Sequence, residues 1–539
     1  MAEDIVLEIG DLWTIALLAI LAVVFVSEVL VSLNSPIVFG DEGFHMRMAQ
    51  WIAENMEYPK YFPFSGSELQ KSGYYRGPIW EFLVAGLSII FGQVDSVVKV
   101  LTPFIASVLT GLITFLILKR LYDKKIGFLT SILTVTIPSV VTYSILFYDI
   151  SLYLFYFSAF VLAMVLALEE DRKKYYFLAG LFGGLAFTTK ALGVVIPPIV
   201  FFVFIYQILK EKKLIDIWKK YIPFLVPALL IMCSFMLRNL VAYGTLCNLP
   251  IVPSIIKGEC WVDNYKPKYV FQQRTEQTGT EVDVFKIGIA NYLNFAYGNI
   301  WLVPFGFFVG MLFVIKDLNR KNIVILIALL FLVYTIISPE FGSRAEDTAR
   351  YTLGFVPFVS LIASIFFVKF YEFLEKNYRY LGLGIILFVL FLSYVNFSEK
   401  LPTMTSIKQF SPLFFEACDW IKSNTPKDIR IMTVWVWHTT YNCQRNVIGN
   451  LADLEMNQDL KFALDTAKKL GITHIFIQKF SMSNEYMSEK YNINFVQFLE
   501  NNTKCFEKIY ENGPALQECI NQGGCDGTIL YEINGECLK

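Results

Sequence analysis

Apolar runs close to the length that a helix needs to cross a bilayer recur from residue 12 to residue 397. We expect eleven spanning helices, at 12–33, 97–118, 126–146, 149–168, 175–190, 192–209, 221–241, 300–316, 322–338, 349–369 and 380–397. The run at 79–92 is short, at about 14 residues. We interpret it as an interfacial helix, with a twelfth span as the alternative. The pattern predicts a polytopic α-helical membrane protein with about 11–13 transmembrane helices.

The composition supports a membrane protein and excludes one class of partner. Of the 539 residues, 55% are hydrophobic and 17% are charged, whereas soluble domains are nearer a quarter charged. The net charge of -1 leaves no basic excess to neutralise phosphates, so we expect no nucleic-acid partner. The first apolar run is too long for a signal-peptide core and lacks a basic flank, so we expect it to be retained.

The loops that carry Lys and Arg predict the orientation. If 79–92 does not span, the basic loops at 119–125, 172–174, 210–220, 316–321 and 369–379 all fall on one side. The positive-inside rule makes that side cytoplasmic, together with the N-terminus. The outer loops are then 34–78 and 242–298. We expect a membrane domain over 1–398 and an extracytoplasmic domain over 399–539, in a multi-pass protein of the cell membrane.

The cysteines agree with an oxidising outer compartment. Cys233 lies within a span, and Cys247 and Cys260 lie in the second outer loop. The other six follow the last span, at Cys418, Cys443, Cys505, Cys519, Cys525 and Cys537. These even groups suit disulfides. A zinc site is the less favoured alternative, because Cys519 and Cys525 do not form a Cys-x-x-Cys pair.

The tail after residue 398 reads as a small α/β domain. We expect strands at 428–435, 473–478, 504–510 and 528–533, and helices at 460–470 and 495–501. The tail has no Gly-rich phosphate loop, nucleophile elbow or metal-ligand spacing. We therefore interpret it as a recognition or structural domain rather than a second active site.

Isolated charges from several segments converge on the predicted outer face, where ionisable groups are candidates for function. They are Asp41, Glu42, His45 and Arg76 in the first outer loop, Asp149 and Lys190 in short outer turns, Arg238 near a helix end, and Arg344, Glu346, Asp347 and Arg350 before a span. Each has an ordinary alternative. Asp41, Glu42 and Asp149 could cap helices, and Lys190 could reach the headgroups. Arg350 could anchor a helix, and His45 could simply pack.

Together these residues suit one chemistry. Cations at the bilayer surface would hold a lipid phosphate, and a carboxylate would remove a proton from an acceptor hydroxyl. The hydroxyl would attack the sugar carbon, and Lys and Arg would stabilise the charge that develops on the phosphate. An apolar groove would take the lipid tail. Asp41, Glu42 and Asp149 could also hold Mg²⁺ or Mn²⁺, although base chemistry alone accounts for them.

The sequence resembles the GT-C class of glycosyltransferases that use lipid-phosphate sugars, especially the protein O-mannosyltransferases and the bacterial aminoarabinose transferases. The resemblance covers residues 10–400. It rests on Asp41-Glu42, on Tyr75-Arg76-Gly77-Pro78-Ile79-Trp80 followed by Phe91-Gly92, on Asp149, on the segment from Gly183 to Lys190, and on Arg350-Tyr351 leading to Pro357, in the order that the family has. The tail loosely resembles that of archaeal members at 420–426, which would fit an archaeal member.

The resemblance implies a polyprenyl or dolichyl phosphate sugar as donor, a site at the outer face of the membrane, no certain cofactor, and a hydroxyl acceptor on protein, lipid or glycan. Asp41 matches the family's catalytic acid, the expected general base, and Glu42 its partner. We expect donor phosphate contacts from Arg76, Lys190 and Arg350, and support from Asp149, His45, Tyr75 and Arg344. Two departures are Arg76-Gly77, where many members have Lys-Pro, and Gly43-Phe44-His45, which bears on sugar specificity.

Two other functions remain open at this level. A transporter or lipid flippase would usually show repeats and broken helices with polar groups at mid-bilayer, whereas these charges lie at one edge. An oligosaccharyltransferase-like enzyme would take its sugar from a pyrophosphate carrier, but the tail has no Trp-Trp-Asp motif. The sequence does not specify the sugar, the acceptor or the length of the lipid.

Overall fold

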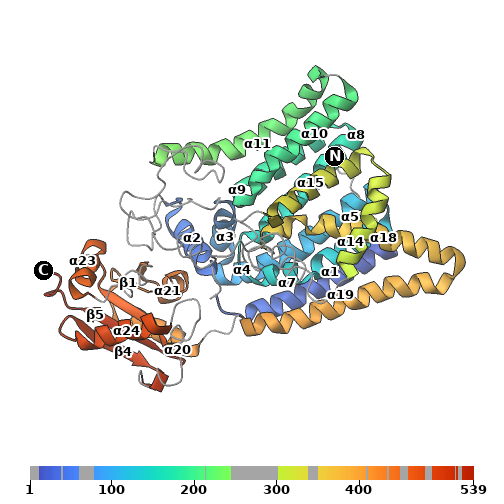
Figure 1. Ribbon diagram of the computed structural model, residues 1–539. Coiled ribbons are helices and arrows are strands. Elements are labelled where there is room, and N and C mark those ends of the chain that lie inside the picture. Colours follow the sequence, from blue (N-terminus) through green and yellow to red (C-terminus); the bar gives the residue numbers. More distant parts are fainter. Residues whose placement is uncertain are drawn as a thin grey trace.

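Up to residue 407, the described part of the chain consists mainly of helices (Figure 1). The computed structural model describes residues 11–37, 41–59, 78–212, 214–243, 302–337, 350–407, 411–433, 436–448, 459–479, 489–515, 518–519 and 525–539. Its helices up to residue 407 are α1 (Leu12–Leu33), α2 (Glu42–Asn55), α3 (Ile79–Phe91), α4 (Val94–Pro103), η1 (Phe104–Leu109), α5 (Thr110–Leu121), α6 (Lys124–Thr136), α7 (Pro138–Ile145), α8 (Ile150–Glu170), α9 (Lys173–Thr189), η2 (Ala191–Val195), α10 (Ile196–Glu211), α11 (Leu214–Tyr243), α14 (Leu302–Lys316), α15 (Arg320–Ile337), η4 (Leu353–Phe355), α18 (Val356–Asn377) and α19 (Arg379–Ile407).

The protein is a multi-pass membrane protein. Among the described residues, seven helices are long and apolar enough to cross a bilayer, and the bent pair α6–α7 makes up to eight. Each of the eleven segments expected from hydropathy overlaps one or more of the described helices. α3 has 13 residues, fewer than the ~20 that a span needs, which favours the interfacial interpretation.

The bend between α6 and α7 has a local cause. The two helices differ in direction by 57°. Pro138 is the first residue of α7, and Ile137 before it is extended, with ψ 134°. The ring of a proline disfavours helical geometry in the preceding residue. The expected span at 126–146 is therefore broken, and α7 leads at an angle into residues 146–149.

The basic loops meet at one end of the helix bundle. Arg120 pairs with Glu170 at 2.7 Å, Lys220 with Asp171 at 2.8 Å, and Arg320 with Glu211 at 3.4 Å. The remaining predicted basic loop joins them, because Lys125 Nζ lies 4.5 Å from the centre of the Tyr371 ring. α8 begins beside Asp149 and ends at Glu170, so it runs from the opposite end of the bundle to this basic end.

One acidic side chain is fully buried between α1, η1 and α7. Glu28 of α1 is 0% exposed. Ser107 of η1 donates to its Oε2 at 2.5 Å, and Ser144 of α7 lies 2.7 Å from its Oε1. The π-helical turn at η1 turns Ser107 towards α1. Glu28 therefore joins three elements just before the segment 146–149.

The C-terminal domain is a five-stranded mixed sheet with helices, as expected for its composition. The strands are β1 (Arg430–Met432), β2 (Asn446–Ile448), β3 (His474–Gln478), β4 (Phe506–Asn512) and β5 (Thr528–Ile533), in the order β2-β1-β3-β5-β4. β1 is parallel to β2 and β3, whereas β5 is antiparallel to β3 and β4. The helices are α20 (Pro412–Asn424), α21 (Val436–Cys443), α23 (Leu460–Leu470) and α24 (Glu489–Asn501). The boundary expected at 398 falls inside α19.

Three disulfides form within this domain, between Cys418 and Cys443, Cys505 and Cys537, and Cys519 and Cys525. All six cysteines after the last span are thus paired with one another. Cys233 is an exposed free cysteine on α11. Cys247 and Cys260 lie outside the described residues.

Candidate active site

The start of α2 places Asp41, Glu42 and His45 at the end of the bundle away from the basic loops. Asp41 holds the N-cap position, but its side chain makes no capping hydrogen bond. Its carboxylate is 22% exposed and lies 3.6 Å from Arg350 Nη1. The capping alternative therefore does not account for Asp41, which instead presents a carboxylate next to a guanidinium at the protein surface.

Glu42 has the opposite environment, although it is the next residue. Its side chain is 0% exposed, and its Oε1 accepts a hydrogen bond from the Phe147 backbone N–H at 3.1 Å. A buried carboxylate needs such donors, because its desolvation is otherwise costly. Glu42 thereby fixes segment 146–149 against α2.

Tyr148 completes this connection. Its hydroxyl oxygen accepts a hydrogen bond from the Asp41 backbone N–H at 3.0 Å. Burial, and then the nearby carboxylates of Asp41 and Glu42, raise the pKa of Tyr148 well above its ordinary value. The phenol therefore stays protonated, and it positions Asp41 without adding negative charge.

A buried polar network continues from α2 to α3 and α9. His45 Nδ1 lies 2.7 Å from Glu81 Oε1, and His45 Nε2 lies 3.9 Å from Asp149 Oδ1. Lys190 Nζ donates to the same Asp149 oxygen at 2.8 Å. Lys190 is 8% exposed, so its ammonium does not reach out to the headgroups. Asp149 makes no capping bond on α8, which again leaves the charged network as its role.

The structure thus brings six of the predicted site residues together, namely Asp41, Glu42, His45, Asp149, Lys190 and Arg350. They come from α2, the turn before α8, the end of α9 and the start of the segment leading to α18. Arg350 also donates to the Tyr351 hydroxyl at 3.0 Å. Tyr75, Arg76 and Arg344 lie outside the described residues, as do Glu346 and Asp347.

Comparison with known proteins supports a glycosyltransferase fold. The family described as dolichyl-phosphate-mannose-protein mannosyltransferase matches residues 75–237. That range includes Asp149 and Lys190 but not Asp41. None of the curated proteins matches the chain.

Solved structures match over nearly the whole chain. ArnT from Cupriavidus metallidurans, bound to undecaprenyl phosphate, has 9% identity and a TM-score of 0.63, with 98% of this chain and 99% of that chain covered. The oligosaccharyltransferase AglB from Archaeoglobus fulgidus, in complex with an inhibitory peptide and a dolichol-phosphate, has 14% identity and the same score, covering 94% and 74%. The chain has the GT-C fold. The arabinofuranosyltransferase AftD from Mycobacteria shares it at 10% identity and a TM-score of 0.53, covering 96% and 40%.

Sequence reasoning missed two residues of this candidate site, Glu81 and Tyr148. Glu81 stands alone in the apolar run 79–92, and the same search for isolated charges would have found it. Tyr148 directly precedes Asp149, but a neutral side chain gives no such signal. The Phe147 contribution is a backbone N–H, which no residue type encodes.

The described acids of the candidate site do not fit a divalent cation. In the part of the chain that the structure describes, no group of three or more His, Cys, Asp or Glu side chains is arranged so that it could hold a metal ion. Asp149 is bonded to an ammonium, Asp41 lies next to a guanidinium, and Glu42 takes a backbone N–H. These acids face cations and donors rather than each other, so we derive no step through a metal.

Proposed function

We propose that this protein transfers a sugar from a polyprenyl or dolichyl phosphate carrier to a hydroxyl acceptor at the extracytoplasmic face of the membrane. The observation that carries the proposal is the partly exposed Asp41 carboxylate, 3.6 Å from the Arg350 guanidinium, in a GT-C fold. A base and a phosphate-binding cation are then adjacent at the end of a membrane bundle. The neighbours that hold undecaprenyl phosphate and dolichol-phosphate support this class of donor.

The chemistry assigns a different task to each acid. Asp41 accepts the proton of the acceptor hydroxyl as the oxygen attacks the anomeric carbon of the sugar. The bond from that carbon to the phosphate oxygen breaks, and its electron pair leaves on the lipid phosphate. Glu42, buried and bonded to Phe147, orients Asp41 rather than taking the proton.

The cations would stabilise the leaving phosphate. Arg350 is 19% exposed and next to Asp41, so its guanidinium is well placed to meet a phosphate oxygen. Lys190 is more deeply buried than Arg350. Its ammonium, held in position by Asp149, would add positive charge from the protein interior. Arg76 belongs to the same proposal through the family resemblance alone.

The orientation follows from the two ends of the bundle. The basic loops gather at the end of α8 that carries Glu170, and the site lies where α8 begins. Cytoplasmic loops carry an excess of Lys and Arg. We therefore place the N-terminus in the cytoplasm, and the site and C-terminal domain outside.

The test supplies membranes with radiolabelled sugars on polyprenyl monophosphate and follows the label to a new acceptor. Asp41→Asn should lower turnover by a factor of about 10²–10⁴, because the base is lost while the shape is kept. Glu375→Gln, an exposed acid at the basic end, is the matched control and should leave turnover unchanged. Normal turnover by Asp41→Asn would reject Asp41 as the base.

Two further arms separate the alternative functions and the cation roles. Arg350→Ala should weaken donor binding by about tenfold, since it removes a charge-assisted contact to phosphate. Label that leaves only a pyrophosphate carrier would favour an oligosaccharyltransferase-like reaction. Lipid that crosses the membrane while it keeps its sugar would favour a flippase.

A further inference from the structure

The C-terminal domain touches the catalytic helix directly at Gly43. A Cβ atom added at Gly43 would collide with the Trp437 backbone oxygen, and it would lie 2.7 Å from the Trp437 carbonyl carbon and 3.3 Å from the His438 nitrogen. Backbone therefore packs on backbone where α21 meets α2. The position is one residue after Glu42.

α21 also holds the chain on the other side of the acidic pair. Asn442 Nδ2 donates to the Ile37 carbonyl oxygen at 3.1 Å. The rings of Phe44 and Trp437 meet edge to face at 5.1 Å. α21 thus contacts the chain on both sides of the acidic pair. It contacts Ile37 before Asp41, and Gly43 and Phe44 after Glu42. Of these contacts, the hydrogen bond joins residues 405 positions apart.

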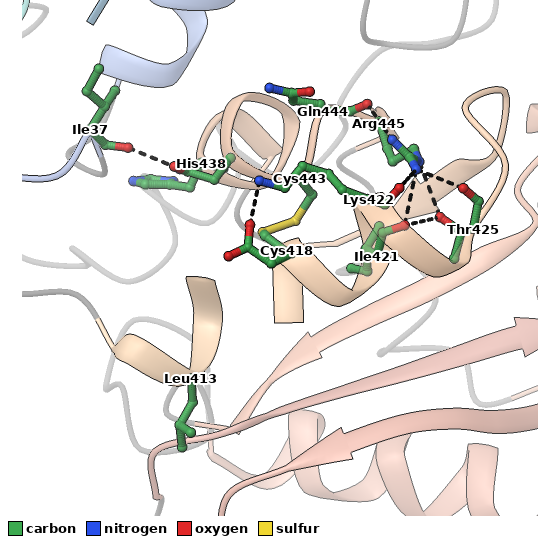
Figure 2. Close-up of a disulfide and its surroundings, with 12 residues drawn as sticks. Ile37, Leu413, Cys418, Ile421, Lys422, Thr425, His438, Cys443, Gln444 and Arg445 are labelled. Carbon is green, nitrogen blue, oxygen red and sulfur yellow. Dashed lines mark hydrogen bonds and ion pairs between the residues drawn. A yellow bond between two sulfur atoms is a disulfide. The ribbon is translucent and has the colours of Figure 1, made fainter. Parts of the chain in front are cut away.

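α21 is itself fastened to α20 (Figure 2). Cys443, its last residue, forms the disulfide with Cys418 of α20. Two residues on, the Arg445 guanidinium donates to the carbonyl oxygens of Ile421, Lys422 and Thr425 at 3.1, 2.9 and 2.8 Å. The Lys422 and Thr425 carbonyls lie at the end of α20, where helix carbonyls lack partners within the helix, whereas the Ile421 carbonyl also accepts from the Thr425 backbone N–H. The C-terminal end of α21 is therefore held to α20 by the Cys418–Cys443 disulfide and by the charge-assisted hydrogen bonds of Arg445.

We propose that α21 is a positioning element of the active site, which fixes the segment carrying Asp41 and Glu42, and that the Cys418–Cys443 disulfide keeps α21 in place to do so. The role rests on the proposed function, since Asp41 is the base there. The contacts given above for α21 are all to the segment around Asp41 and Glu42, so its loss should reduce the chemical step rather than donor binding. A 1 Å misplacement of a catalytic group is enough to slow a reaction about a hundredfold.

The first experiment changes the contact at Gly43. Alanine normally favours a helix over glycine, so Gly43→Ala should be benign if α21 did not matter. We expect a kcat about tenfold lower than wild type with an unchanged KM for the lipid donor. Gly86→Ala, in α3 where a Cβ would meet nothing within 4 Å, is the matched control and should keep both values. Full turnover by Gly43→Ala, or a rise in donor KM instead of a fall in kcat, would overturn the proposal.

The second experiment tests the fastening without any assay of sugar transfer. Cys418→Ser with Cys443→Ser is compared with Cys505→Ser and Cys537→Ser, which removes another disulfide of the same domain. Hydrogen exchange is measured on the whole protein in nanodiscs. Amides of 42–48 should exchange about fivefold faster in the first variant only. Unchanged exchange at 42–48 would reject the positioning role, whereas a wild-type protein that transfers no sugar would reject the proposed function alone.

Discussion

At the scale of single residues, two neighbouring acids, Asp41 and Glu42, lie in different environments. Asp41 and Glu42 follow each other, yet one lies next to Arg350 at the surface and the other is fully buried against Phe147. Consecutive residues at the start of a helix point about 100° apart. The sequence could name the pair but could not say which acid would be exposed, because that depends on what packs around α2.

Glu28 gives a residue-scale prediction. The Ser144 hydroxyl has one proton but lies 2.7 Å from Glu28 Oε1 and 2.8 Å from the Val141 carbonyl oxygen. A neutral carboxyl resolves this, because it donates to Ser144 while Ser144 donates to Val141 and Ser107 donates to the other oxygen. An amide offers the same pattern. Glu28→Gln should therefore keep wild-type stability, whereas Glu28→Leu should lose about 1–3 kcal/mol because the buried Ser107 hydroxyl loses its acceptor.

Thermal unfolding of the two variants in detergent measures this difference. The turnover of each variant shows whether the change at Glu28 also disturbs the candidate site, to which α7 is joined by segment 146–149. If Glu28→Gln loses as much stability as Glu28→Leu, the site holds an ionised carboxylate and the neutral assignment is wrong.

At the scale of elements, hydropathy predicted where the helices lie but not how they bend or meet. The eleven apolar segments follow from the length that a bilayer requires. The break at Ile137 was signalled by Pro138, but a scan for apolar runs treats proline as one more tolerated residue. The spanning helices that end at the site were thus predictable, whereas α2, which carries Glu42 and His45, is not one of these apolar segments. Their convergence on segment 146–149 was not, because it depends on a backbone donor and a neutral phenol.

The crossing of α9 and α11 gives an element-scale prediction. A Cβ at Gly180 of α9 would lie 2.7 Å from the Phe224 carbonyl carbon of α11, so the two backbones touch. Small residues at such crossings let membrane helices approach closely. Gly180→Ala should push α11 away and lower stability by about 1–3 kcal/mol, outweighing the gain of ~1 kcal/mol that alanine gives a helix.

The control for this crossing is Gly384→Ala on α19, where a Cβ would meet nothing within 4 Å. It should be neutral or slightly stabilising when both variants are melted in the same detergent. Because α9 ends next to Lys190, Gly180→Ala should also lower turnover. A stabilised Gly180→Ala protein would show that α9 and α11 can accommodate the added methyl group.

At the scale of the whole molecule, the two ends of the bundle have different chemistry. One end holds the surface ion pairs of the basic loops, and the other holds the buried network around Asp149. The sequence predicted this polarity because loop charges are visible in it. It could not predict that the tail folds back on α2, because a hydrogen bond between Asn442 and Ile37 leaves no local pattern.

The polarity predicts which thiols a reagent can reach in intact cells. Lys461→Cys places an exposed thiol on α23 of the C-terminal domain, and Lys212→Cys places one at the basic end, both combined with Cys233→Ser. A maleimide that cannot cross the membrane should label Lys461→Cys in intact cells, and Lys212→Cys only after permeabilisation. The Cys233→Ser protein without a new thiol gives the background.

The disulfides support the same orientation. Disulfides persist in oxidising compartments, so the three in the C-terminal domain are expected outside the cytoplasm. The reverse labelling pattern would put Asp41 on the cytoplasmic side and would remove the reason for a lipid-linked donor, since soluble sugar nucleotides would then be within reach.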